Sequence, residues 1–414
     1  MNKLRIQTYQ LLRWSQKYTK TDMLYLVKGG SWLTLEKAVT TLAGLGLAIA
    51  FANLIPEDTY GVYKYIISVA GIIGALTLSG MQTAVIQAVS KGNDGALRQG
   101  FWEIMKWNSL MVVASLGGAL YYFLHDNITL MIGLLLIGFF YPILSSSAIY
   151  NSFLEGKKDF RRRSSYMMIR EILQALTLIG VMLLTQNILW ILLVFFFINS
   201  IPILLLYFRT LKIYQPEVTN DEKLVTYSKH LSVINILSTV AKHIDKVLVF
   251  TFLGAGELAV YTFATLPVER MNDLKGIFKT LALPKFSNTD LTLLQKTLPW
   301  KLVLFFVSLL VTTAIFIFTA PYIYKLVFPQ YLESVRFAQI FALTLPLLPG
   351  ILLTNVLIAH AKQKELYILN ITTDAVKILL LLILLPTYGI LGGIIALLID
   401  RVLRATIPAY FVFK

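Results

Sequence analysis

The amino-acid sequence predicts an all-α integral membrane protein with twelve transmembrane helices in two six-helix lobes. Of its 414 residues, 57% are hydrophobic and only 14% are charged, whereas soluble domains carry about 25% charged residues. Apolar stretches of about 20 residues, the length that crosses a bilayer, recur along the whole chain. Basic residues are concentrated in alternate connectors between these stretches, which is the pattern of a multi-pass topology.

The apolar stretches define twelve candidate spans separated by short connectors. Their ranges are 31–54, 60–88, 104–124, 128–153, 165–185, 188–209, 226–253, 258–282, 300–320, 333–359, 366–385 and 388–411. No connector is long enough to fold as a separate soluble domain. The expected organisation is an N-terminal segment of 1–30, a first lobe of 31–212, a linker of 213–225 and a second lobe of 226–414.

The distribution of basic residues orients these spans. Most of the 37 lysines and arginines fall in the N-terminal segment, at the C-terminal end and in the connectors that follow even-numbered spans, whereas the opposite connectors contain only Lys325. Because cytoplasmic connectors are enriched in Lys and Arg, we expect both termini to be cytoplasmic. This topology also accounts for most of the net charge of +15, so the charge does not indicate a nucleic-acid partner.

The two halves of the chain contain related segments. Tyr60-Gly61-Val62-Tyr63 follows the first span, and Leu258-Ala259-Val260-Tyr261 follows the seventh, 198 positions later. Prolines also recur in the fourth and tenth spans, as Pro142 and as Pro346 and Pro349. Six spans per half place both halves in the same orientation, which indicates a parallel duplication about an axis along the membrane normal.

The seventh span carries an unusual set of ionisable groups. Lys242, His243, Asp245 and Lys246 lie within about one and a half turns, and each charge would cost about 2.5–3.5 kcal/mol at the bilayer centre. At 100° per residue, Lys242, Asp245 and Lys246 share one helix face, and Asn235 continues that face. The span therefore lines either a water-filled cavity or a buried polar network.

Other spans contribute similar groups. Lys37 lies in the first span, and Glu269 and Arg270 lie in the eighth. Asp374 and Lys377 are three residues apart in the eleventh span, where they could pair with each other or contact a substrate or ion. Basic groups outnumber acidic ones in this embedded set, so we expect a central cationic cavity and an anionic passenger.

These positions give the candidate site residues. The expected substrate-binding residues are Lys242, Lys246, Lys37, Asn235, Arg270 and Lys377. The expected ion-coupling residues are Asp245, Asp374 and Glu269. Asp400 and Arg404 have the spacing of a structural pair, and the run Arg161–Arg163 is interpreted mainly as a topology anchor, with capture of a lipid pyrophosphate as the alternative.

Three segments resemble one known family. "KGGSWLTLEKAVTTLAGLGLAIAFANLIPEDTYGVYKYI", "HIDKVLVFTFLGAGELAVYTFA" and "LPTYGILGGIIALLI" resemble parts of the Wzx-type polysaccharide flippases. These belong to the MOP superfamily, with the MATE drug exporters and the lipid II flippase. The resemblance implies two six-helix lobes around a cavity with alternating access. It also implies a substrate, an undecaprenyl-pyrophosphate-linked oligosaccharide that moves from the inner to the outer leaflet of the bacterial cytoplasmic membrane.

The residues limit the alternatives. The sequence has no phosphate-binding loop for ATP, no cysteine and no metal-ligand spacing among its four histidines, so no cofactor or metal is expected. A MATE-like drug/ion antiporter remains the alternative function, and a membrane polysaccharide polymerase is disfavoured because the predicted outer connectors are short. The expected partners are the lipid-linked substrate, membrane lipids, and a polysaccharide polymerase with its chain-length regulator.

Overall fold

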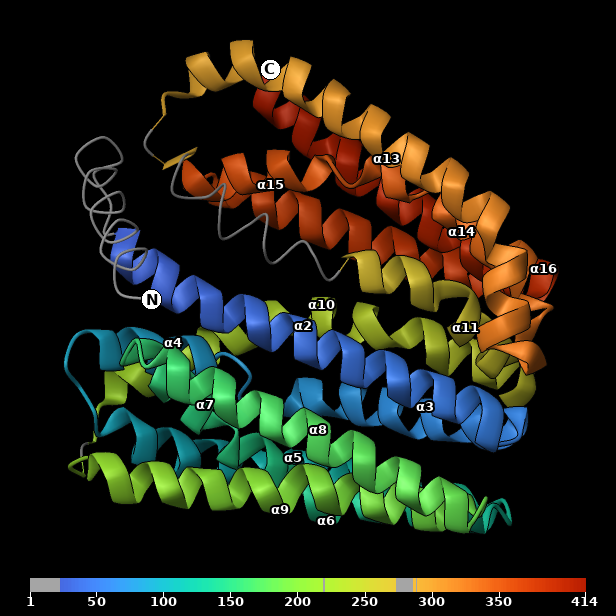
Figure 1. The fold of residues 1–414 in the computed structure, drawn as a ribbon. Coiled ribbons are helices and arrows are strands. Elements are labelled where there is room, and N and C mark those ends of the chain that lie inside the picture. Colours follow the sequence, from blue (N-terminus) through green and yellow to red (C-terminus); the bar gives the residue numbers. More distant parts are fainter. Residues whose placement is uncertain (1–22, 219, 273–285, 288) are drawn as a thin grey trace, which may run out of the picture.

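The computed structural model describes residues 23–218, 220–272, 286–287 and 289–414. Within these residues the chain is helical, with short connectors and no β-strand. Figure 1 shows that the helices form two groups, one from each half of the chain.

The first group contains the helices of the N-terminal half. They are α2 (Met23–Leu54), α3 (Glu57–Ile73), η1 (Gly74–Leu76), α4 (Met81–Ser90), α5 (Ala96–Leu124), α6 (Ile128–Ser147), α7 (Ile149–Gly156), α8 (Phe160–Leu184) and α9 (Ile188–Tyr214). Within this group α2 packs against α8, α8 against α9, α9 against α6, and α6 against α5.

The second group contains the helices of the C-terminal half. They are α10 (Glu222–Leu253), α11 (Ala255–Asn272), α13 (Leu291–Val327), η2 (Pro329–Tyr331), α14 (Ser334–Ala342), η3 (Leu345–Leu347), α15 (Gly350–Ala359) and α16 (Gln363–Phe413). In this group α10 and α15 pack against α16, and α14 packs against α11 and α13.

Polar residues in the short connectors start several of these helices. The side chains of Asn127, Asp159, Asn187 and Asp221 accept hydrogen bonds from backbone N–H groups in the first turns of α6, α8, α9 and α10. These N–H groups have no partner within the helix, so a side-chain acceptor stabilises each start by about 1 kcal/mol.

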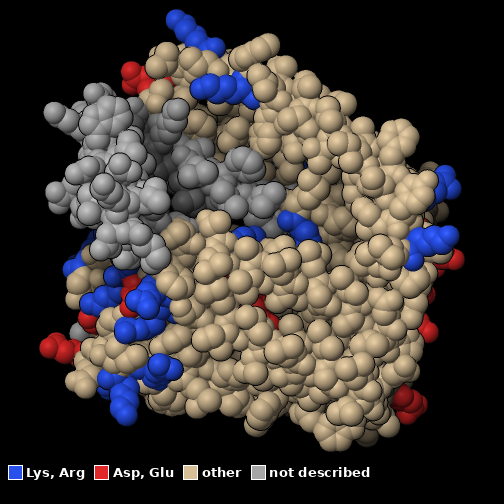
Figure 2. Space-filling model, viewed as in Figure 1, with Lys and Arg blue, Asp and Glu red and all other residues tan. Residues whose placement is uncertain are grey.

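The protein is a multi-pass membrane protein. Among the described residues, eight helices are long and apolar enough to cross a membrane, or nine if the bent pair α14 and α15 forms one span. The charged helices α10 and α11 are not among these candidates. The predicted number of twelve spans and the cytoplasmic position of the termini stay predictions. Figure 2 shows Lys and Arg gathered toward the left-hand end of the first group.

Two predicted spans differ from the structure. The span predicted for 60–88 ends as a helix at Leu76, and a new helix starts at Met81. The N–H of Gly80 in this break donates to the Ser232 hydroxyl of α10 at 2.9 Å, because a backbone group at membrane depth needs a partner. The span predicted for 333–359 is bent by 42° between α14 and α15. The last residues of the span predicted for 258–282 lie outside the described part of the chain.

The long helix α16 folds back on itself at Gly389. This glycine has φ 59° and ψ −143°, which are not helical values. Arg404 contacts Asp374, 30 positions earlier, and a straight helix would separate them by about 45 Å. The two halves of α16 are therefore antiparallel, which agrees with two predicted spans, 366–385 and 388–411.

The related segments of the two halves meet each other. Tyr60 and Leu258 are each the fourth residue of their helices, α3 and α11, and these two helices pack together. A Cβ atom on Gly61 would lie 1.8 Å from the carbonyl oxygen of Ala255, so the close approach requires glycine there. Tyr60 also packs against Phe263 of α11, with 5.0 Å between ring centroids. This buried contact joins the two groups at one end of the molecule.

Candidate functional site: two charged cavities

The larger charged cavity, here called the C-terminal cavity, has a volume of 650 Å³ and lies within the second group of helices. Its walls come from α10, α11, α14 and α16. Its charged lining residues are Lys242, Asp245, Lys246, Glu269, Asp374, Lys377, Asp400, Arg401 and Arg404. The lining thus has five basic and four acidic groups.

Lys246 lies between two carboxylates. Its Nζ is 3.9 Å from Asp245 Oδ2 on the same helix and 3.8 Å from Glu269 Oε1 on α11. Asp245 is 3% exposed, and its Oδ2 also accepts a hydrogen bond from the Tyr261 hydroxyl at 3.0 Å. One ammonium group therefore partly neutralises two acids, which offsets the cost of embedding them.

Arg404 forms a second bridge of the same kind. Its Nη2 is 2.5 Å from Asp374 Oδ1, and its Nε is 2.9 Å from Asp400 Oδ1. The other oxygen of Asp374 accepts a hydrogen bond from Ser238 of α10 at 2.7 Å. The predicted pair of Asp400 and Arg404 is confirmed. Asp374 and Lys377 do not pair, because Arg404 occupies Asp374 after α16 folds back.

The other three basic residues of the C-terminal cavity form no ion pair within the described part of the chain. Lys377 is only 8% exposed, and its Nζ donates to the backbone carbonyl of Ala241 at 2.6 Å. The Nε of Arg401 is buried without a hydrogen-bond partner. Lys242 is exposed and faces the cavity. Two basic residues thus contact all four acids, and three basic residues form no ion pair, while the described lining has a net charge of +1.

A second cavity of 320 Å³, here called the interface cavity, lies between the two groups. Its walls come from α2, α3 and α8 of the first group and α11 of the second. Its charged lining residues are Lys37, Lys64, Glu171 and Arg270. Glu171 forms an ion pair with Arg170, so the lining has a clear excess of positive charge.

Two contacts position the basic groups of the interface cavity. The Lys64 ammonium lies over the rings of Tyr60 and Tyr63, 5.2 and 5.9 Å from their centroids. Such contacts stabilise a cation with little exposure to water. Arg270 reaches across to α2, where a Cβ atom on Gly44 would lie 3.0 Å from its guanidinium. Gly44 therefore leaves the room that this arginine occupies.

All nine predicted site residues line one of the two cavities. Lys37 and Arg270 line the interface cavity, and the other seven line the C-terminal cavity. Their roles in transport stay predictions. The structure adds Lys64, Arg401 and Arg404 to the basic lining. Lys64 lies close to the start of the predicted span 60–88, and Arg401 and Arg404 lie toward the end of 388–411, where a charged side chain can also reach the membrane surface.

The basic run Arg161–Arg163 is occupied by protein contacts. Arg161 lies over the Trp32 ring, and Arg162 pairs with Asp159. Arg163 pairs with Glu36 of α2 at 3.1 Å, which joins α2 to α8. These contacts support a structural role.

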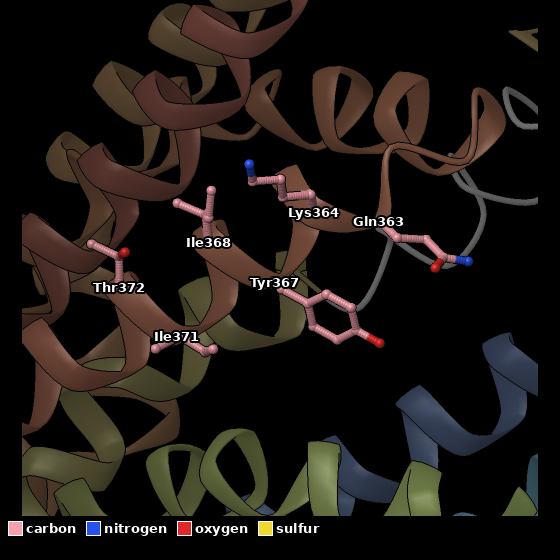
Figure 3. A pocket seen from close by; sticks show the side chains of 6 residues that line it. All are labelled: Gln363, Lys364, Tyr367, Ile368, Ile371 and Thr372. Carbon is pink, nitrogen blue, oxygen red and sulfur yellow. The ribbon is translucent and has the colours of Figure 1, made fainter.

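A third hollow is lined by one face of α16. Figure 3 shows its six side chains, including Lys364 and Tyr367, projecting from the start of that helix. Asn370, one turn after Tyr367, lines the C-terminal cavity, so this hollow lies next to that cavity along α16.

The fold and the two charged cavities define a multi-pass, all-helical membrane protein with a charged interior. The chain belongs to the polysaccharide biosynthesis protein family, whose model matches residues 26–288. The resemblance to Wzx-type flippases found in the sequence is therefore confirmed. None of the curated proteins matches the chain.

Solved structures show the same fold. The lipid II flippase MurJ in an inward closed conformation is similar with a TM-score of 0.69 and 16% identity, covering 92% of this chain and 87% of that chain. An outward-facing MATE family multidrug transporter has a TM-score of 0.63 and 14% identity, covering 94% of both chains. A MOP superfamily transporter from Pyrococcus furiosus, described as having a binding pocket of reverse polarity, has a TM-score of 0.58 and 13% identity, covering 94% of both chains.

Proposed function

We propose that this protein moves an undecaprenyl-pyrophosphate-linked oligosaccharide, such as an O-antigen or capsule repeat unit, from the inner to the outer leaflet of the bacterial cytoplasmic membrane. Membership of the polysaccharide biosynthesis family supports this class of substrate. The observation that carries the proposal is the cationic lining of the cavities. Among the described residues, the two cavities together are lined by eight basic and five acidic side chains, and the pyrophosphate group of the substrate is anionic.

The arrangement of helices suits alternating access. The interface cavity lies between the two groups, and the contact of α3 with α11 joins the groups at one end. We propose that the α3–α11 contact opens, and the two groups separate at that end, when the passenger leaves toward the outer leaflet. The product would pass to a polysaccharide polymerase and its chain-length regulator.

Ion coupling is proposed to act through Asp245. Both oxygens of Asp374 are occupied, one by Arg404 and one by Ser238. Asp245 has a buried oxygen, Oδ1, without a hydrogen-bond partner, so it is better suited to receive a proton or sodium ion. If Asp245→Asn transports at the same rate with and without a proton or sodium gradient, while the unaltered protein responds to one of them, Asp245 is the coupling residue. An unchanged response in the variant would exclude it.

The alternative function, MATE-like drug export, is compatible with the fold, but it requires a cavity lining of the opposite charge. A carrier of cationic drugs needs an acidic cavity, whereas both cavities here have an excess of basic groups. Growth of cells with and without the gene in the presence of cationic drugs tests this alternative. Resistance conferred by the gene would favour drug export.

The proposed transport can be measured in proteoliposomes. A fluorescent prenyl-pyrophosphate-linked oligosaccharide starts in one leaflet, and an added glycosidase reports its arrival in the other. We expect Lys64→Met combined with Lys377→Met to reduce the rate by at least about tenfold, because both cavities lose a basic group. Lys364→Met, which removes a basic residue outside both charged cavities, is the matched control and should keep the rate. Equal rates for all three proteins would contradict the proposal.

A further inference from the structure

The C-terminal cavity combines basic groups that form no ion pair with a hydrogen-bond acceptor that has no donor. Lys377 is 8% exposed and has no acidic partner in the described part of the chain. Embedded charges without a partner are costly, and they typically mark a site for a ligand or ion. Arg401, whose Nε is buried without a hydrogen-bond partner, also forms no ion pair among the described residues, and neither does Lys242, which is exposed to the cavity.

The hydrogen-bond acceptor without a donor is Asp245 Oδ1. This atom is buried without a hydrogen bond, whereas Oδ2 of the same carboxylate accepts from Tyr261. A buried acceptor without a partner costs about 1–3 kcal/mol, which a donor on a ligand would offset. A ligand that carries an anionic group and a nearby hydroxyl therefore matches the lining.

The charges of the two cavities suit different anions. Among its described lining residues, the interface cavity has three basic groups and one acidic group, which matches the two or more charges of a pyrophosphate. The C-terminal cavity has five basic and four acidic groups, which matches a single negative charge. A carboxylate next to ring hydroxyls, as in a uronic acid, has both properties.

The two cavities are close enough for one passenger to occupy both. Glu269 lines the C-terminal cavity, and its neighbour Arg270 lines the interface cavity. Adjacent Cα atoms are about 3.8 Å apart, so only the thickness of α11 separates the cavities at this point. A pyrophosphate and a sugar of the same molecule can span that distance.

We propose that the C-terminal cavity binds the carboxylate of an acidic sugar in the passenger, while the interface cavity binds its pyrophosphate. Lys377, Arg401 and Lys242 contact the carboxylate, and Asp245 Oδ1 accepts a hydrogen bond from a sugar hydroxyl. This inference rests on the proposed function and narrows its substrate to acidic oligosaccharides.

Two synthetic probes test the inference. Both are trisaccharides linked by pyrophosphate to a short prenyl chain, and they differ only in the terminal sugar, which is glucuronic acid in one and glucose in the other. Their dissociation constants are measured by calorimetry on the full chain in lipid nanodiscs. We expect the acidic probe to bind at least about tenfold more tightly, as a charge-assisted contact provides.

Two variants assign this preference to one cavity. Lys377→Met should bind both probes equally, at the affinity of the neutral probe, and Arg401→Gln should reduce the preference in the same direction. Lys64→Met, in the interface cavity, should weaken both probes by the same factor and keep the preference. Thermal unfolding of each variant verifies that the fold is intact.

The outcomes separate this inference from the proposed function. Equal binding of the two probes by the unaltered protein, or an unchanged preference in Lys377→Met, would overturn the acidic-sugar site and leave the flippase proposal standing. If neither probe binds the unaltered protein, the proposed function fails as well.

Discussion

The two charged cavities acquire their positive character in different ways. In the interface cavity the excess follows from composition, because the described lining contains Lys37, Lys64 and Arg270 but only one acid, Glu171. In the C-terminal cavity basic and acidic residues are almost equal in number. The net charge there is only +1, and geometry decides which basic groups are available, since Lys246 and Arg404 each contact two carboxylates and three basic groups form no ion pair within the described part of the chain.

A count of charges therefore does not identify the basic groups that are available to a passenger. A basic residue that bridges two buried acids maintains the structure, and removing it leaves those acids without a counterion. A basic residue without an acid can be removed at little cost to the fold. Within the C-terminal cavity, bridging and unpaired basic residues should therefore respond differently to substitution.

Arg404→Met should produce the largest loss of stability. It leaves Asp374 and Asp400, whose side chains are 4% and 7% exposed, without their shared partner. Breaking a buried pair in this way costs about 3–5 kcal/mol. Thermal unfolding in detergent should show a clearly lower midpoint than for the unaltered protein.

Lys362→Met provides the matched control for this prediction. Lys362 pairs with Glu365 at 3.9 Å, but its side chain is 45% exposed, and exposed pairs contribute about 0–1 kcal/mol. Lys242→Met should likewise leave the midpoint almost unchanged. If Arg404→Met unfolds no more easily than these two variants, the bridge does not stabilise the fold.

The sequence alone predicts features that depend on local patterns and misses those that depend on distant contacts. Hydropathy located the helices, because a span needs a long apolar stretch. The repeat identified Tyr60 and Leu258 as equivalent positions, and both are the fourth residue of their helices, but the contact between α3 and α11 was not predicted. The break between Leu76 and Met81 was missed, since the hydroxyl that accepts the hydrogen bond of the Gly80 N–H belongs to Ser232, 152 positions away.

The sequence predicted several residues that line the C-terminal cavity, but not the ion pairs that they form. Helical spacing placed Lys242, Asp245 and Lys246 on one face, and all three line one cavity. Spacing also suggested that Asp374 could pair with Lys377, but its partner is Arg404, which reaches it only after the chain reverses at Gly389. Local periodicity does not contain such long-range contacts.

Gly44→Leu should have the next largest effect, on transport through the interface cavity. A Cβ atom at Gly44 already lies 3.0 Å from the Arg270 guanidinium, so a leucine side chain would displace it and occupy the cavity. We expect a transport rate about tenfold lower in proteoliposomes, as for loss of one charge-assisted contact.

Gly46→Leu is the control for this prediction, because a Cβ atom there has no neighbour within 4 Å. It lies on the same helix and adds the same side chain, so it reproduces any general effect of leucine on α2. Equal rates for the two variants would show that the position of Arg270 against α2 is irrelevant to transport.

Glu171→Gln should have the smallest effect, a change in the affinity for the probe. The sign of this change shows whether the net charge of the interface cavity or the placement of its acid determines binding. Glu171 is the only acidic lining residue described in the interface cavity, and it already pairs with Arg170. Its removal leaves the cavity more positive and Arg170 without a counterion, so the glucose-terminated pyrophosphate probe should bind about two- to threefold more tightly. The change is small because partly exposed pairs contribute about 0–1 kcal/mol. Weaker binding would instead mean that Glu171 accepts a hydrogen bond from the passenger, and the interface cavity would then depend on the placement of its acid, as the C-terminal cavity does.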